Sequence, residues 1–233
     1  MDILEILRSH DTCLVSNAIE TFNVRMRNDG YVHDTVRCIF PELPPVAGYA
    51  VTARIRTSAP PIANLCYYHR TDFWQYIASR PGPKLLAVED ADRVPGIGAL
   101  LGEIHARIAK SLGCVGYISN GTVRDVAGLQ AAGFQCFASG LCVSHSYAHV
   151  IEFGEPVEIG GLRIQDGDLL HGDCHGVQLI PAEVIDRLPQ AIADIQRRER
   201  DLIGFCQSPR FSLERLVEIL QQDEASCEPP KPR

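Results

Sequence analysis

The sequence has 233 residues, of which 45% are hydrophobic and 22% charged, as expected for one globular domain with a full core. A formal net charge of −7, without a basic cluster, argues against a nucleic-acid partner. No apolar run reaches the ~18 residues needed to span a membrane, and the N-terminus lacks the basic-then-apolar order of a signal peptide. We therefore expect a cytoplasmic protein with no membrane partner.

Nine cysteines are present, and no two of them form a Cys-x-x-Cys pair. Several lie inside apolar runs, where a free cysteine behaves as a small hydrophobic residue. An odd number without metal-binding spacing favours reduced thiols in structural or incidental roles.

The first 95 residues are predicted to hold short helices and two strands. In order, we expect helices at 2–8 and 14–22, a strand at 46–57, a helical segment at 62–80 and a buried strand at 84–88. Glu89-Asp-Ala-Asp92 follows as an acidic loop. Such a run is more often a solvated loop than a metal ligand, so we favour the solvated loop over metal contact.

The middle of the chain is predicted to form a glycine-rich loop, a helix, a strand and a tight turn. The loop runs from Gly96 to Glu103, and Ile104, Ile108 and Leu112 recur at helical spacing as an apolar face of the helix that follows. Gly113 ends this helix before an apolar strand at 114–119. Asn120-Gly121 is predicted to form a tight turn, because both residues tolerate positive φ. Arg124-Asp125 follows shortly after this turn.

This unit brings a cation, a carboxylate and a helix start to one end of a strand. The N–H groups of a helix start attract anions, the carboxylate of Asp125 suits a hard divalent cation, and Arg124 can clamp a carboxylate or enolate. Such a set suits a small oxo-acid held on a metal, although an Arg-Asp pair after a turn is more often an ion pair or a cap. The spacing Gly96-x-Gly98-x-x-x-Gly102 misses the dinucleotide fingerprint. We expect the loop to present backbone N–H groups to a small anion instead.

The C-terminal half is predicted to be a β-meander followed by helices. We expect a helix at 126–132, a strand at 134–138, a meander at 142–181, a helix from Pro181 to about Ile203 kinked at Pro189, a helix at 212–221 and a disordered tail at 222–233. The domain prediction is therefore one catalytic domain at 1–221, including a C-terminal helical extension, plus the tail.

Histidine pairs and lysines offer two alternative chemistries. His145/His149 and His171/His175 have the i, i+4 spacing that chelates zinc on a helix, but both fall in strand-rich sequence, so structural or surface roles are favoured. The three lysines are Lys84 at a strand start, Lys110 facing solvent and Lys231 in the tail. None is in a setting predicted to desolvate the amine, which disfavours a Schiff-base route.

Glu103, twenty intervening residues and then Arg124-Asp125 match a known signature, (Asp/Glu)-x20-Arg-Asp. The chain resembles the 4-hydroxy-4-methyl-2-oxoglutarate aldolases of the RraA-like superfamily, which is named after a regulator of ribonuclease E. The resemblance covers roughly residues 10 to 200 and includes the segments 12–18, 48–52, 133–138, 160–168 and 172–181.

The resemblance implies an α/β fold of the swivelling β/β/α sandwich type, assembled as a homotrimer or a homohexamer. It implies that Asp125 ligates Mg²⁺ or Mn²⁺ and that Glu103 holds the ion through waters. Backbone N–H groups at Gly102, Glu103 and Ile104 would hold the carboxylate of a 2-oxo acid, and Arg124 would stabilise the enolate. Glu199 of a neighbouring subunit is the candidate that would help to carry protons.

The resemblance implies two activities and leaves one alternative. The activities are cleavage of 4-hydroxy-2-oxo acids to pyruvate and decarboxylation of oxaloacetate, because both pass through the same enolate. The alternative is a non-catalytic interaction protein like the ribonuclease E regulator, which lacks the metal-binding aspartate that this chain keeps as Asp125. Glu103 is one methylene longer than the aspartate of the best-known aldolases, and Asn120 stands where many relatives carry aspartate.

Overall fold

The computed structural model describes residues 2–61 and 70–226. Its centre is an eight-stranded sheet in the order β1-β6-β4-β3-β2-β11-β12, with β8 paired to β2. The strands are β1 Arg37–Cys38, β2 Val46–Arg56, β3 Lys84–Asp90, β4 Cys114–Ser119, β5 Thr122–Val123, β6 Gln135–Ala138, β7 Gly140–Leu141, β8 His149–Phe153, β9 Val157–Ile159, β10 Leu162–Ile164, β11 Leu169–Asp173 and β12 Gly176–Leu179. The helices are α1 Ile3–Arg8, α2 Thr12–Glu20, α3 Arg70–Ser79, α4 Glu103–Ser111, α5 Val126–Ala131, the 3₁₀ turn Ala182–Val184, α6 Leu188–Cys206 and α7 Leu213–Ser226.

The middle of the sheet is parallel and mostly buried. β2, β3, β4 and β6 run parallel to one another, and α4 and α5 connect β3 to β4 and β4 to β6. Parallel strands joined by helices are covered on both faces and therefore read as continuous apolar runs. This is why residues 85–88 are all apolar, and the strand continues in the structure to Asp90.

Three apolar clusters surround the sheet. The first lies under α3, α4 and α5, and the second lies where α1, α2 and α6 pack against the β11 side of the sheet. The third is closed by the β9–β10 hairpin, whose Val157, Ile159, Leu162 and Ile164 cover the face opposite α4. Helices on one face and a hairpin on the other give the mixed α/β sandwich that the sequence predicted.

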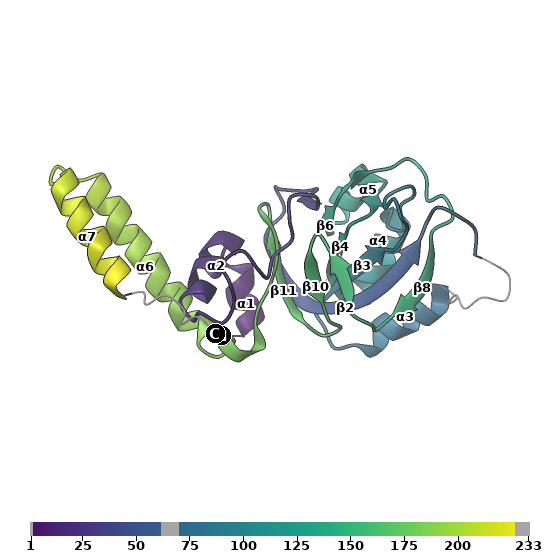
Figure 1. Cartoon of the computed structure of the whole chain (residues 1–233). Helices are drawn as coiled ribbons and strands as arrows, with labels where there is room; N and C mark the ends of the chain where they lie inside the picture. The colour runs from purple at the N-terminus through teal and green to yellow at the C-terminus, as the bar shows by residue number, and fades with distance from the viewer. Residues whose placement is uncertain (1, 62–69, 227–233) are drawn as a thin grey trace.

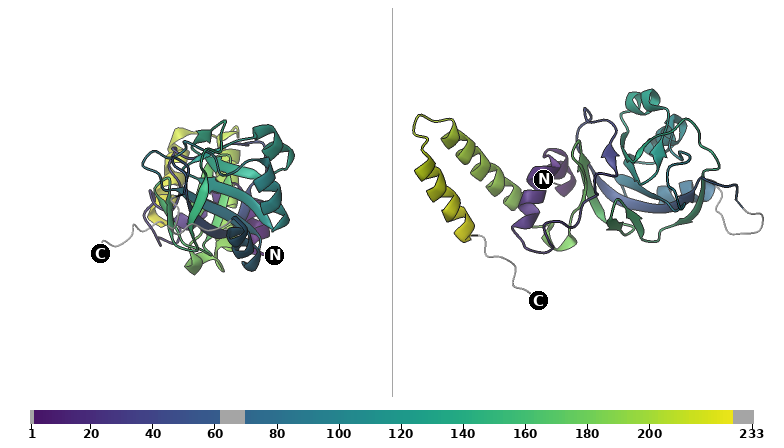
Figure 2. Two further views of the ribbon diagram at one scale, coloured as in Figure 1. Left: turned by 90° about the vertical axis from the view of Figure 1, so that its right-hand side faces the viewer. Right: turned by 45° about the horizontal axis from the view of Figure 1, so that its top comes forward.

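A helical arm extends from this body. α6 packs on α2 near its start, and α6 and α7 then run side by side away from the sheet (Figures 1 and 2). Phe205 and Phe211 contact each other where the two helices are joined, with ring centroids 5.7 Å apart. Several apolar side chains of the arm are nevertheless exposed: Ile203, Leu213, Val217 and Leu220.

Two predicted features of the C-terminal region are corrected by the structure. Pro189 does not kink a helix that starts at Pro181; it lies in the first turn of α6, where its missing N–H costs no hydrogen bond. α7 continues to Ser226, so residues 222–226 are helical rather than part of a disordered tail. The predicted helical segment at 62–80 is described only from Arg70, and its first part, like residues 227–233, lies outside the described residues.

The predicted apolar face of α4 is wrong in its orientation. Ile104 is 75% exposed and Ile108 is 38% exposed, whereas Ala106 and Ala109 are fully buried. The two alanines let the helix lie close to the sheet, and the isoleucines are turned outward as a result. α4 therefore presents branched apolar side chains to its surroundings.

The environment of Lys84 also differs from the prediction. This side chain is only 5% exposed, and its Nζ donates a 2.6 Å hydrogen bond to the carbonyl oxygen of Leu112, which caps α4. A positive charge at a helix C-terminus is favourable because the carbonyl groups there are unpaired.

In the described part of the chain, no helix is long and apolar enough to cross a membrane.

Candidate functional site

Arg124 and Asp125 lie between β5 and α5, where the chain turns sharply. Asp125 precedes the first residue of α5 and has φ 58° and ψ 45°, a left-handed conformation that is uncommon for a residue other than glycine. Such strain costs roughly 1–3 kcal/mol and often accompanies function. The surrounding structure fixes it: Leu129 N donates to the Asp125 carbonyl oxygen at 3.0 Å.

The start of α4 lies directly against this turn. Leu101 forms a parallel bridge with Val123, and Arg124 N donates to the Leu101 carbonyl oxygen at 3.1 Å. The Asp125 carboxylate therefore reaches the helix start, where Oδ2 accepts a 3.3 Å hydrogen bond from Glu103 N. Arg124 Nε is 3.4 Å from the same oxygen. The Arg-Asp pair and the helix N-terminus are together, as predicted.

Gly102 makes this approach possible. A Cβ atom at Gly102 would lie 2.5 Å from Asp125 Oδ2 and 3.2 Å from both Cγ and Nε of Arg124. Its φ of −137° is accessible to any residue, so the requirement for glycine here comes from space and not from backbone conformation. Gly102 is also the N-cap of α4 and offers no side chain that would occupy the free N–H groups.

A pocket of about 200 Å³ opens at this point. It is lined by Ala99, Leu100, Gly102, Ile104, His105, Arg124, Asp125, His145 and Ala148. The first intrahelical bond of α4 runs from Ala106 N to the Gly102 carbonyl oxygen, so the N–H groups of the first turn point toward the pocket end of the helix. The pocket thus combines a guanidinium, a carboxylate and the positive end of a helix dipole.

The side chain of Glu103 is directed elsewhere. Its Oε1 accepts a 2.8 Å hydrogen bond from Arg107 Nε and forms an ion pair with Arg107 Nη2, also at 2.8 Å, along the surface of α4. A Cβ at Gly128 would lie 2.4 Å from Glu103 Oε2, so the carboxylate rests against α5 and is not among the groups that line the pocket. The backbone N–H of Glu103 donates the 3.3 Å hydrogen bond to Asp125, so this residue contributes to the site through its main chain.

Glu199 is not brought to the pocket within one chain. It lies on the arm helix α6, and its Oε1 accepts a 3.0 Å hydrogen bond from Asn17 Nδ2 of α2. Figure 1 shows α6 and α4 at opposite ends of the molecule. A contribution of Glu199 to this site therefore requires a second subunit.

The glycine loop binds groups of its own chain and not an external anion. Gly96 N donates to Asp90 Oδ2 at 2.7 Å, and Gly98 N donates to Thr57 Oγ1 at 3.3 Å. The prediction that this loop presents its N–H groups to a small anion is therefore wrong for these two positions. Burial raises the pKa of Asp90, while the bond from Gly96 counteracts part of that rise.

The prediction of a solvated loop at 89–92 is wrong: β3 continues to Asp90, which is only 1% exposed, and the carboxylates of this run have protein partners. Asp92 accepts bonds from the N–H and hydroxyl groups of both Thr57 and Ser58, at 2.7 to 3.1 Å. Glu89 forms an ion pair with Arg54 at 3.1 Å. These carboxylates fix the ends of β2 and β3.

Two histidines of the pocket escaped the sequence reasoning. His105 follows Ile104 on α4, and its ring lies 5.6 Å from that of Trp74. The spacing of His145 from His149 does not predict its position, because the structure places His145 in the pocket wall, where its backbone packs against the glycine loop. A Cβ at Gly98 would lie 2.7 Å from the His145 carbonyl oxygen, so the backbone around His145 can approach the glycine loop only because residue 98 is glycine. Gly98 is therefore the one weak indication of this contact in the sequence.

The pocket fits a hard divalent cation through one carboxylate. The Asp125 side chain is 43% exposed, and a pocket of about 200 Å³ has room for several waters around an ion. Mg²⁺ commonly keeps most of its waters and takes one or two protein carboxylates, so Asp125 alone satisfies the minimum. Glu103 would contribute only after release from Arg107.

The chain is a mixed α/β protein with a pocket at a helix N-terminus that Arg124 and Asp125 help to line. The family model described as "RraA-like: Aldolase/RraA" matches residues 12–179, and the chain belongs to this family. The predicted family and fold class are thereby confirmed.

Two curated relatives match about half of the chain. A protein of Halalkalibacterium halodurans, named "Putative 4-hydroxy-4-methyl-2-oxoglutarate aldolase", is 31% identical over 124 residues, which are 51% of this chain and 59% of that protein. An uncharacterized protein of Methanocaldococcus jannaschii is 30% identical over 105 residues, which are 45% of this chain and 50% of that protein. The matched region thus spans little more than half the length of these relatives.

Solved structures extend the similarity of fold over nearly the whole chain. An uncharacterized protein from Pseudomonas syringae pv. tomato has a TM-score of 0.73 at 20% identity, covering 93% of this chain and 92% of that one. RraAS2 of Streptomyces coelicolor, described as an unusual member of the RNase ES inhibitor RraA protein family, has a TM-score of 0.67 at 18% identity, covering 85% and 93%. At these identities the likeness establishes the fold alone.

Proposed function

We propose that the protein is a divalent-metal-dependent pyruvate aldolase that cleaves 4-hydroxy-2-oxo acids, such as 4-hydroxy-4-methyl-2-oxoglutarate, and decarboxylates oxaloacetate. The observation that carries this proposal is the pocket in which Arg124, Asp125 and the N-terminus of α4 converge. Membership of a family described as aldolase/RraA, together with the name of the Halalkalibacterium relative, supports an aldolase over other uses of such a pocket.

Each group of the pocket has a role in this reaction. Asp125 would hold Mg²⁺ or Mn²⁺, and the bound ion would act as a Lewis acid on the 2-oxo group of the substrate. The N–H groups at the start of α4, near Gly102, Glu103 and Ile104, bind the substrate carboxylate in the field of the helix dipole. Arg124 stabilises the negative charge that develops on the enolate oxygen as the C3–C4 bond breaks.

The same groups serve both reactions. In the aldol cleavage, the 4-hydroxyl proton is removed and the bond between C3 and C4 breaks to leave the enolate of pyruvate. In oxaloacetate, the bond to the departing carboxylate breaks instead, CO₂ leaves, and the same enolate remains. One proton delivered to C3 gives pyruvate in both cases. Arg124 therefore stabilises the same negative charge on the enolate oxygen in both reactions.

A shared site between subunits would supply the missing acid–base group. Large apolar side chains are exposed in or beside the segments that form the pocket, namely Ile97, Ile104, Leu141 and Tyr147, and the arm carries exposed apolar residues as well. In a closed ring of identical subunits, each pocket meets the same surface of a neighbour. We place Glu199 of the neighbouring arm at the pocket and expect a homotrimer or homohexamer.

Mixed oligomers test this arrangement. Asp125→Asn and Glu199→Gln would each be inactive alone, and the two would be dissociated, mixed and reassembled. A shared site returns part of the activity, because some interfaces then pair an intact Asp125 with an intact Glu199. Mixed oligomers that stay inactive would place the whole site in one chain or exclude Glu199.

The aldolase itself is tested by pyruvate release. The purified chain would be incubated with 4-hydroxy-2-oxo acids and oxaloacetate, with Mg²⁺ or Mn²⁺ and then with a chelator. We expect metal-dependent pyruvate formation from at least one substrate. Absence of pyruvate from the whole panel under both metals would favour a non-catalytic regulator of the RraA kind.

A further inference from the structure

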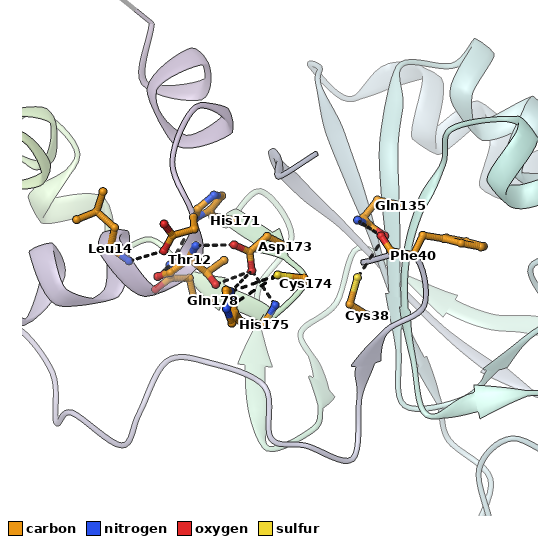
Figure 3. A network of polar contacts seen from close by, with 11 residues as sticks. Thr12, Leu14, Cys38, Phe40, Gln135, His171, Asp173, Cys174, His175 and Gln178 are labelled. Atoms are coloured by element: carbon orange, nitrogen blue, oxygen red, sulfur yellow. Dashed lines mark hydrogen bonds and ion pairs between the residues drawn. The ribbon is translucent and has the colours of Figure 1, made fainter. Parts of the chain in front are cut away.

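A second cluster of ligand-type side chains lies at the tip of the β11–β12 hairpin. Asp173 and Gly176 pair across the strands, so Cys174 and His175 are the two residues of the turn. Gly176 has φ 134°, a conformation that L side chains rarely adopt, and this lets the chain reverse directly after His175. Figure 3 shows Asp173, Cys174 and His175 together at this tip, beside Thr12 of α2.

The ligand atoms of these three residues converge. One potential ligand atom from each lies within 4.8 Å of the other two. His175 Nδ1 is 3.1 Å from Asp173 Oδ1 and 3.5 Å from Cys174 Sγ. For Zn–S near 2.3 Å and Zn–N or Zn–O near 2.1 Å, a tetrahedral ion requires about 3.4 Å between N and O and about 3.6 Å between N and S. The observed distances are close to both values.

The carboxylate of Asp173 is held in place by its surroundings. Its Oδ2 accepts a 2.8 Å bond from Thr12 N, and its Oδ1 accepts bonds from Thr12 Oγ1 at 2.7 Å and His175 N at 2.9 Å. Hydrogen bonds of this kind orient metal ligands in proteins. They also fix the start of α2 against the sheet, so the cluster lies at the joint between α2 and β11.

A cavity adjoins the cluster beside His175. It has a volume of about 210 Å³ and is lined by residues of α2 and the hairpin, including Cys13, His175 and Gln178. Gln178 is only 3% exposed, and its Oε1 is buried without a hydrogen-bond partner among the described residues. A buried amide oxygen without a partner is costly, so a water or ion shell in this cavity would satisfy it.

We propose that Asp173, Cys174 and His175 bind a borderline-soft divalent cation, Zn²⁺ foremost, with the fourth position open to a water. A thiolate and an imidazole select zinc-like ions over Mg²⁺, which prefers oxygen ligands only. On binding, the Cys174 thiol loses its proton to solvent, and the neutral imidazole carries its hydrogen on Nε2 while Nδ1 ligates. None of these residues lines the pocket of Arg124 and Asp125, so this site is independent of the proposed aldolase.

Cobalt substitution tests the site in the full-length chain. Co²⁺ added to metal-free protein is expected to give a near-ultraviolet thiolate-to-cobalt charge-transfer band, at one ion per chain, that Zn²⁺ displaces. Cys174→Ser should remove the band and weaken Zn²⁺ binding by more than about 100-fold, beyond the effect of losing an outer hydrogen bond. Cys206→Ser, at an exposed thiol of α6, and Asp125→Asn should keep both.

The outcomes separate clearly. A wild-type chain that gives no thiolate band with Co²⁺, or a Cys174→Ser chain that keeps the band, overturns the proposal. His175→Ala provides a second variant at an exposed turn position, and its folding is checked by circular dichroism. Unchanged Zn²⁺ affinity in a folded His175→Ala protein would also contradict the assignment.

Discussion

The substitution Gly102→Ala separates activity from stability at the candidate site. The new methyl group would lie 2.5 Å from Asp125 Oδ2, whereas ordinary contacts begin at 3.4 Å, so the carboxylate oxygen must move by roughly 0.9 Å. Arg124 Cγ and Nε, each at 3.2 Å, must also give way by a few tenths of an ångström. A misplacement of about 1 Å in a catalytic constellation costs about 10²-fold in rate.

The stability of the same variant should hardly change. Gly102 has an extended backbone that alanine adopts freely, and a compatible Gly→Ala exchange gains about 0.4–1 kcal/mol through the unfolded state. Alanine is a poorer N-cap than glycine, and this loss offsets the gain. We therefore expect a Tm within about 2–4 °C of the wild type, since that shift corresponds to about 1 kcal/mol in a chain of this size.

The assay is pyruvate release from oxaloacetate in the presence of Mn²⁺, measured beside thermal unfolding. Gly140→Ala is the matched control, because a Cβ at that position meets no atom within 4 Å. We expect kcat/KM to fall by about 10²-fold in Gly102→Ala and to stay at the wild-type value in Gly140→Ala. Full activity in Gly102→Ala would show that the contact between Gly102 and Asp125 does not shape the reacting site.

Three further substitutions test separate parts of the account. Arg124→Lys keeps the charge but loses the planar guanidinium, so kcat should fall by about 10²–10³-fold; a change in KM alone would make Arg124 a binding residue. The Lys84 amine is buried against the Leu112 carbonyl outside the pocket, so Lys84→Met should keep the wild-type kcat. For the same reason, borohydride added with pyruvate should not inactivate the wild type. Loss of kcat with trapped pyruvate would indicate a Schiff base. For Asp92, burial raises the pKa, but the bonds from Thr57 and Ser58 prevail and hold it below the ordinary 3.8. Asp92→Asn should therefore cost about 1–3 kcal/mol at neutral pH, a difference that shrinks as the pH falls below 3.8; a difference that does not depend on pH would contradict this.

The sequence predicts the central unit well because its signals are local. Gly113 precedes the buried strand β4 and Asn120-Gly121 follows it. The predicted position of the chain reversal is right, but its geometry is wrong, because the structure has a bend there and neither Asn120 nor Gly121 has positive φ. The approach of Arg124 and Asp125 to the start of α4 follows from this order of elements. Residues that end a helix or reverse the chain locally therefore suffice to predict that Arg124 and Asp125 lie next to a helix N-terminus.

The rotation of α4 and the direction of the Glu103 side chain could not be predicted in the same way. Ile104 and Ala106 are both apolar, and which of them faces the sheet depends on how closely the helix packs, a tertiary property. Glu103 has Arg107 one turn later, and this i, i+4 ion pair competes with any role in the pocket. Both outcomes depend on packing that spacing alone does not contain.

A long-range contact explains the position of His145, and a tight turn explains that of His175. His145 reaches the pocket because its backbone packs on Gly98, far away in sequence. His175 was compared with His171 at a helical spacing, whereas a two-residue hairpin turn places it beside its own neighbours Asp173 and Cys174. The glycine after His175 was the only local indication of that turn.

Binding of Mn²⁺ measured together with turnover, in the wild type and in Asp125→Asn, tests the central claim most directly. Asparagine keeps the shape of the side chain and tolerates the left-handed backbone at this position, so the fold should be preserved. We predict that calorimetry detects Mn²⁺ binding and the assay detects pyruvate release in the wild type, and that both are lost in a folded Asp125→Asn protein. Equal Mn²⁺ affinity and equal pyruvate release in the two proteins would remove Asp125, and with it the proposed metal-dependent site, from the account.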